Sequence, residues 1–181
     1  MKRRFLTLAA LLLRLVAPAQ VFAKGETVKI TIKGADLKTP IEITNPKILT
    51  GFTVWTGPGT SSSVPRFNSN APGFIIDWSR GAIEEPPKGL QRYEVSFWAK
   101  LPSKKKLIYV VLYEYDPATE QGYVYLPGRK DEWYRLNVDT IFHGVEGKWF
   151  HAWSVWNNVA RPLLANPQVT TSNVGHPLPS R

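Results

Sequence analysis

Hydrophobic and polar residues alternate along much of this chain, which is the period of a β-strand with one face turned to a core. In residues 27–33, Val28, Ile30 and Ile32 fall on one face, and lysines and threonine fall on the other. Residues 93–100 alternate in the same way, and residues 107–116 are almost all β-branched or aromatic, a composition enriched in strands. The pattern therefore predicts a chain built mainly of β-strands.

Turn residues divide these segments. Asp116-Pro117 opens a turn and Gly122 closes it, so residues 107–126 are predicted to form a hairpin. The preceding connection holds three lysines in residues 101–106 and is typical of a solvated turn. Shorter strands are expected at residues 41–44, 48–55, 74–78, 133–138 and 148–153.

A helix is expected only near the C-terminus. Ser154 is a suitable N-cap, and Trp156, Val159 and Leu163 recur at helical spacing. Pro162 lacks an N–H group and is predicted to make the helix short or kinked. The predicted fold class is mainly β, with about eight antiparallel strands in a sandwich or a strongly curved sheet and one short C-terminal helix; α+β is the alternative.

The first 23 residues have the order of a secretory signal peptide: basic residues at positions 2–4, an apolar run at 5–16, and small residues before Lys24. We predict cleavage after Ala23, with Ala19 as the alternative site. The run is shorter than the roughly 20 residues that span a bilayer, and an N-terminal anchor is the alternative reading. We expect a periplasmic or extracellular protein with no membrane span after cleavage, one β-rich domain over residues 24–165 and a disordered tail over 166–181.

Composition narrows the classes of function. The 181 residues include 23 Lys and Arg against 14 Asp and Glu, a formal net charge of +9. Much of this excess lies in the first 23 residues and the tail, so the high pI does not indicate a nucleic-acid partner. The absence of cysteine excludes disulfides, thiolate metal sites and cysteine nucleophiles.

Motifs of catalysis are not found in the sequence. There is no phosphate-binding loop and no Gly-x-Ser-x-Gly elbow, and His143, His151 and His176 do not have the spacing of metal ligands. Glu114 and Asp116 lie on the same face of one strand, about 7 Å apart at the usual strand rise. That separation suits the two carboxylates of a glycosidase, but every pair of residues i and i+2 on a strand has it. We therefore predict no catalytic residue, no metal and no cofactor, and we favour a protein that is not an enzyme.

Tyrosines give the candidate binding surface. Tyr113 and Tyr115 share one face of the strand at 107–116, opposite aliphatic residues, and Tyr123 and Tyr125 follow across the hairpin. A phenol suits a half-wet surface because its ring is apolar and its tip polar. We predict that these four tyrosines, with Trp133 nearby, contact a ligand; a second apolar layer covered by another sheet is the competing interpretation.

The chain also resembles short exported bacterial proteins that are uncharacterised. The resemblance covers roughly residues 29–164, implies a bacterial exported protein, and implies no activity. It rests on four segments: residues 88–95 (KGLQRYEV), 113–117 (YEYDP), 122–128 (GYVYLPG) and 131–138 (DEWYRLNV).

Taken together, these observations predict an exported non-catalytic binding or interaction module, with an envelope glycan or protein as its partner. The alternatives are a carboxylate-dependent hydrolase of envelope polymer and a structural part of an envelope assembly.

Overall fold

The computed structural model describes residues 25–34, 37–60, 72–101 and 104–166. Within these ranges the chain forms seven strands, three α-helices and one 3-10 helix. The strands are β1 (Glu26–Gly34), β2 (Ile41–Ile43), β3 (Ala82–Ile83), β4 (Gln91–Lys100), β5 (Lys105–Asp116), β6 (Gln121–Tyr125) and β7 (Trp149–His151), and the helices are α2 (Pro46–Leu49), η1 (Trp78–Arg80), α3 (Tyr134–Thr140) and α4 (Ser154–Ala165).

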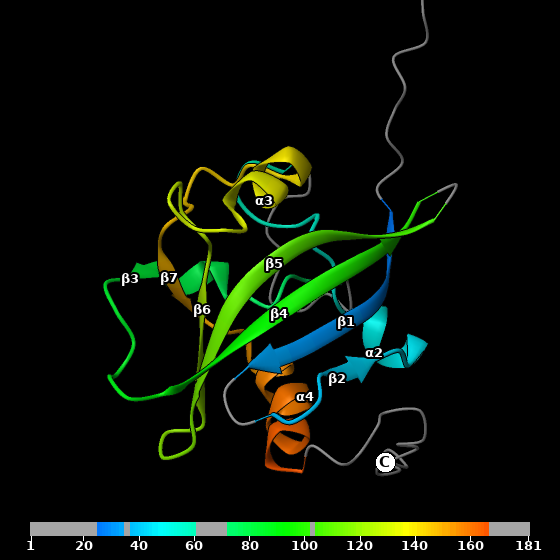
Figure 1. Ribbon diagram of the computed structural model, residues 1–181. Coiled ribbons are helices and arrows are strands. Elements are labelled where there is room, and N and C mark those ends of the chain that lie inside the picture. Colours follow the sequence, from blue (N-terminus) through cyan, green and yellow to red (C-terminus); the bar gives the residue numbers. More distant parts are fainter. Residues whose placement is uncertain (1–24, 35–36, 61–71, 102–103, 167–181) are drawn as a thin grey trace, which may run out of the picture.

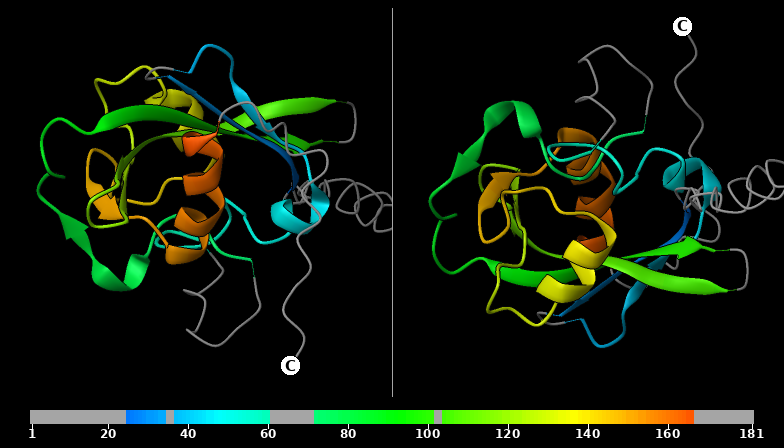
Figure 2. Two further views of the ribbon diagram at one scale, coloured as in Figure 1. Left: turned by 90° about the horizontal axis from the view of Figure 1, so that it is seen from below. Right: turned by 90° about the horizontal axis from the view of Figure 1, so that it is seen from above.

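All seven strands belong to one antiparallel sheet in the order β2-β1-β4-β5-β6-β7-β3 (Figure 1). The sheet bends around α4, which lies in its hollow (Figure 2). The prediction of a mainly β fold with a C-terminal helix is confirmed, and of the two arrangements considered, the curved sheet is the one observed.

The core fills the space between α4 and the concave face of the sheet. From α4, Trp156, Ala160 and Leu163 are buried, and the Trp156 ring meets the rings of Phe52 and Tyr113 edge-on at centroid distances of 5.3 and 5.9 Å. The sheet contributes Ile30 and Ile32 of β1, Val95 and Phe97 of β4, Val111 and Tyr113 of β5, and Val124 of β6. One continuous apolar core therefore joins the beginning of the domain to its end.

Helix α4 forms where it was predicted, but Ser154 is its first helical residue and Trp153 its N-cap, and Pro162 does not end it. The helix runs through Pro162 to Ala165, a length of 12 residues. The missing N–H group leaves the carbonyl of Asn158 without its helical donor. Because Asn158 and Pro162 are both exposed, water can solvate that carbonyl, which explains why the helix continues.

Three predicted strands are not strands. Residues 133–138 mostly form α3, whose Asn137 is buried. Residues 48–55 hold the end of α2, which Asn45 caps by accepting a hydrogen bond from the Lys47 N–H, and residues 74–78 carry an isolated bridge before η1. Residues 48–55 and 74–78 are apolar only over short stretches, where helical and strand periods cannot be separated. In residues 133–138 the buried residue is polar, so the sequence gives no helical hydrophobic period.

The predicted signal peptide and the predicted tail beyond Asn166 lie outside the described residues. Among the helices that are described, none has both the length and the apolar character needed to cross a membrane.

Candidate functional site

The sheet has a second, outer face that α4 does not cover, and its side chains form rows across the strands. Antiparallel partners directly opposite one another project to the same face. The register pairs Arg92 of β4 with Glu114 of β5, Glu114 with Tyr123 of β6, and Tyr123 with His151 of β7. Polar and aromatic groups from four strands are thus placed side by side on this outer face.

A neighbouring row adds larger aromatic side chains. It runs from Leu112 of β5 through Tyr125 of β6 to Trp149 of β7. The rings of Tyr125 and Trp149 lie 5.1 Å apart between centroids. The Tyr125 hydroxyl donates a hydrogen bond of 2.9 Å to Asp131 Oδ2, and burial, followed by this hydrogen bond, raises the pKa of Tyr125. Trp149 therefore packs against the Tyr125 ring, whose position is fixed by its hydrogen bond to Asp131.

This register separates the predicted tyrosine surface into two parts. Tyr123 and Tyr125 lie on the outer face, but Tyr113 pairs with Val124 and Tyr115 with Gly122, which places both on the core side. Tyr113 is fully buried, and its hydroxyl donates to Asn157 Oδ1 of α4 at 3.0 Å. The prediction that the four tyrosines share one face is wrong.

Trp133, the fifth predicted residue, lies over the same outer face as Tyr123 and Tyr125. Its indole N–H donates a 2.9 Å hydrogen bond to Glu94 Oε2 of β4. Lys33 of β1 forms an ion pair with the other oxygen of Glu94 at 2.9 Å and lies 5.7 Å from the centre of the Trp133 ring. The aromatic surface thus extends from β7 across the sheet toward β1.

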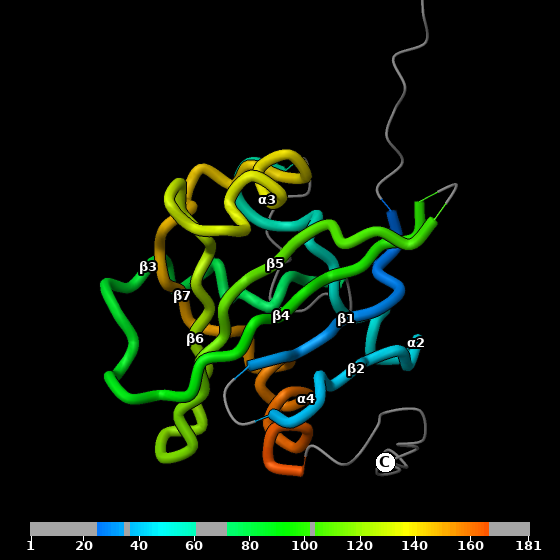
Figure 3. The backbone as a smooth tube through the Cα atoms, viewed as in Figure 1, coloured from blue at the N-terminus to red at the C-terminus, as the bar shows by residue number. Residues whose placement is uncertain are grey.

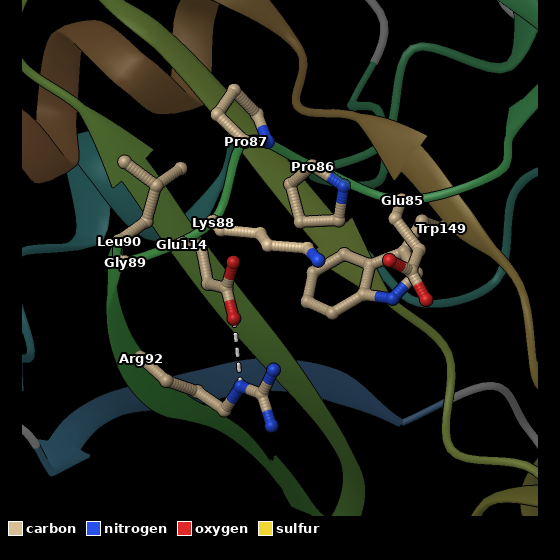
Figure 4. Close-up of a pocket in the computed structure, with 9 residues that line it drawn as sticks. All are labelled: Glu85, Pro86, Pro87, Lys88, Gly89, Leu90, Arg92, Glu114 and Trp149. Carbon is tan, nitrogen blue, oxygen red and sulfur yellow. Dashed lines mark hydrogen bonds and ion pairs between the residues drawn. The ribbon is translucent and has the colours of Figure 1, made fainter.

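A cavity of about 420 Å³ opens beside these rows, under the connection from β3 to β4. Arg92, Glu114 and Trp149 project into it from the sheet, and Glu85 and Lys88 border it from the connection (Figure 4). The rest of its lining is Pro86, Pro87, Gly89 and Leu90. Of the lining, sequence reasoning considered only Glu114, as a catalytic carboxylate, and it did not predict the cavity, because Glu85 and Lys88 are remote in sequence from Trp149.

An ion pair orders the floor of the cavity. The Arg92 Nε–H donates to Glu114 Oε1 at 2.7 Å, and the guanidinium carbon lies 5.6 Å from the centre of the Trp149 ring. The Glu114 side chain is only 6% exposed, whereas that of Arg92 is 59% exposed. A buried carboxylate needs a charged partner. Arg92 supplies it while keeping N–H groups accessible to a ligand.

The far end of the first row carries an imidazole, that of His151. The rings of His151 and Tyr123 lie 5.5 Å apart between centroids. Burial, followed by the nearby Arg80 guanidinium, lowers the pKa of His151, and its Nδ1 is buried with no hydrogen-bond partner among the described residues. His151 is therefore neutral at pH 7, and the row carries opposite charges only at Arg92 and Glu114.

The structure separates the carboxylates considered for catalysis. Asp116 opens the turn after β5, where its carboxylate accepts from the Thr119 hydroxyl at 2.7 Å and the Ala118 N–H at 2.9 Å, and these bonds lower its pKa. Glu114 is paired with Arg92 instead. In the part of the chain that the structure describes, no three His, Asp or Glu side chains are grouped so as to hold a metal ion.

Comparison with known proteins identifies no relative: no family model, no curated protein and no solved structure matches this chain.

Proposed function

We propose that this protein is an exported, non-catalytic binding module whose outer-face cavity holds an uncharged segment of an envelope glycan. The observation that carries the proposal is the placement of the Trp149 ring and the Arg92–Glu114 ion pair in one cavity of about 420 Å³. Ligand sites commonly combine an apolar or aromatic wall with a few fixed polar groups.

The Trp149 ring suits the apolar face of a sugar. An aromatic ring supported from behind loses little conformational freedom when a ligand stacks on it, and Tyr125 supports Trp149 in this way. Trp133, which is half-buried, continues the aromatic surface beyond the cavity, so a chain of several sugar rings could follow the same face. Tyr123 is buried and packs beneath this surface.

The charged groups favour an uncharged, hydroxyl-rich ligand. Lys88 and Arg92 supply donors, and Glu85 and Glu114 supply acceptors, so the four formal charges of the lining cancel. Sugar hydroxyls both donate and accept hydrogen bonds and can meet both kinds of group. A strongly anionic or cationic ligand would meet a like charge in either orientation.

The test is calorimetric titration of the protein with neutral N-acetylhexosamine oligomers, comparing wild type, Trp149→Ala and Trp98→Ala. Trp98 of β4 lies on the same outer face of the sheet as Trp149 but outside the cavity, so Trp98→Ala is the matched control. We expect Trp149→Ala to weaken binding at least about tenfold and Trp98→Ala to change it little. Because Trp149 is half-buried, Lys88→Ala on the exposed connection serves as a second variant that leaves the core intact.

A hydrolase of envelope polymer is the second candidate, because Glu85 and Glu114 border one cavity. Release of reducing ends from the same oligomers, lost in Glu114→Gln, would favour it over the binding module. The third candidate, a structural part of an assembly, requires an apolar surface for its neighbours. Phe142 and Val155 are the only large hydrophobic residues exposed in the described ranges, which gives this candidate little support.

A further inference from the structure

The net positive charge of the described domain is concentrated at one place. The described residues hold 16 Lys and Arg against 13 Asp and Glu. Four of these lysines, Lys100, Lys104, Lys105 and Lys106, lie at the β4–β5 turn, where Glu26 of β1 is the acidic residue placed beside them in the strand register. Without these five residues the remaining charges balance, at 12 of each sign.

The turn lies at the end of a projecting hairpin. β6 pairs with β5 only from Leu112 onward, so the part of the hairpin nearer the turn extends past β6, with β1 alone continuing beside β4 (Figure 3). The Leu101 N–H donates to the Lys104 carbonyl at 3.0 Å across the turn, and the four lysines are all exposed. Their ammonium groups therefore lie in solvent, far from the cavity, which is at the opposite end of β4.

Two of the lysines face each other directly. Lys100 and Lys105 are partners in the β4–β5 register, and like charges placed opposite one another destabilise a sheet. Glu26 is the register partner of Lys100 on the other side, one carboxylate among four ammonium groups. The repulsion between these lysines disfavours the folded hairpin, and contact with an anionic surface would reduce that repulsion.

The position of this hairpin relative to the N-terminal segment indicates that the anionic surface is a membrane. β1 begins at Glu26, the register partner of Lys100, so the chain carrying the apolar run of residues 5–16 enters the domain at the lysine-bearing end. Before the predicted cleavage, a membrane that receives this run would therefore lie at the end of the domain that bears the four lysines. Clusters of lysine near a membrane segment bind anionic lipid head groups.

We propose that Lys100, Lys104, Lys105 and Lys106 form a contact surface for anionic phospholipid head groups. Arg92, at the cavity, lies eight residues from Lys100 along β4, roughly 26 Å at the usual strand rise. A domain held by the lysines therefore presents its cavity away from the bilayer. This inference does not depend on the proposed glycan site, because it involves none of the cavity residues.

The test is co-sedimentation of the full chain with vesicles of phosphatidylcholine alone and of phosphatidylcholine with one quarter phosphatidylglycerol. Each lysine near an anionic surface changes partitioning about fivefold, so Lys104→Gln, Lys105→Gln and Lys106→Gln together should reduce retention on anionic vesicles about a hundredfold. Retention on neutral vesicles reports the contribution of residues 5–16, which every variant shares.

The control removes the same charge elsewhere, as Lys38→Gln, Lys47→Gln and Lys130→Gln, three exposed lysines away from the hairpin. We expect this variant to bind nearly as the wild type does, and the hairpin variant to unfold at the same or a higher temperature. Equal losses in both triple variants, or equal retention of the wild type on neutral and anionic vesicles, would overturn the proposal. Binding to soluble polyphosphate without extra retention on anionic vesicles would also overturn it, in favour of a soluble polyanion.

Discussion

The side-chain amide of Asn137 makes two hydrogen bonds to the backbone of Val110. Its Oδ1 accepts from the Val110 N–H at 2.8 Å, and its Nδ2 donates to the Val110 carbonyl at 2.6 Å. This occurs on the part of β5 that extends past β6, where the edge of the strand would otherwise be unpaired. One fully buried residue of α3 thus takes the place of a neighbouring strand.

Replacing Asn137 with alanine should lower the free energy of unfolding by about 2–4 kcal/mol, because each buried backbone group left unpaired costs about 1–3 kcal/mol. Chemical denaturation would measure the change. Asn158→Ala, at an exposed position of α4, is the control and should stay within about 0.5 kcal/mol of wild type. A similar, small effect in both variants would show that the amide is dispensable.

A methyl group at Gly122 should be poorly tolerated. A Cβ atom there would collide with Asn157 Oδ1 and approach the Tyr113 hydroxyl to 2.7 Å. We expect Gly122→Ala to destabilise the protein by about 3 kcal/mol, the effect of overpacking a filled core. In the double variant with Asn157→Ala the combined loss should be smaller than the sum, because the first obstacle is gone. Additive losses would contradict this packing.

The ion pair at the cavity should matter more than an ion pair at the surface. Arg92→Met leaves the buried Glu114 carboxylate without its cation, for an expected loss of about 1–3 kcal/mol. Lys29→Met breaks the Lys29–Glu42 pair, which is 2.8 Å long but has Glu42 49% exposed, and should cost less than about 1 kcal/mol. Thermal melting of the two variants at pH 7 makes the comparison. Equal losses would mean that burial of Glu114 does not set the cost.

Acid should weaken the fold through His143. Its Nδ1 lies 2.6 Å from the Pro58 carbonyl oxygen, its backbone N–H donates to Glu146 Oε1, and the rings of Phe74, Trp78 and Tyr109 surround it. Burial lowers the pKa of His143, and the Pro58 hydrogen bond only partly opposes this.

Below its ordinary pKa of about 6.5, the unfolded chain therefore binds a proton at His143 that the folded chain does not yet bind. The contribution of His143 to the free energy of unfolding is therefore fully present above that pH. It decreases as the pH falls, by up to about 1.4 kcal/mol per pH unit, until the pH reaches the pKa of His143 in the folded protein. His143→Gln should flatten the profile of unfolding free energy between pH 7 and pH 5. An unchanged profile would assign the acid sensitivity to other groups.

The alternation of apolar and polar residues predicted β1, β4, β5 and the β5–β6 hairpin, because long amphipathic strands impose their period on the sequence. It did not predict α3, where Asn137 is the buried residue and a polar side chain gives no hydrophobic signal. The prediction of strands around α2 and η1 was wrong for a related reason, because a short run of apolar residues fits both the helical and the strand period.

The candidate site shows a different limit. Tyr113 and Tyr115 were correctly placed on one face of β5, but that face could not be recognised as the core because both faces are rich in apolar residues. The four-residue connection from Asp116 to Gln121 then sets the register, and one residue more or fewer would move Tyr123 and Tyr125 to the other face. Cavity residues from the β3–β4 connection became visible only once the chain was folded.

The position of α4 in the hollow of the sheet has a consequence for the order of folding. Trp156 and Leu163 complete a core that includes Ile30 and Ile32, so the apolar face of the first strand stays uncovered until the last helix has been synthesised. Domains generally fold as units during synthesis, and this one must wait for nearly its whole length. If the predicted signal peptide directs export, this delay gives it time to be recognised while the chain behind it is still unfolded.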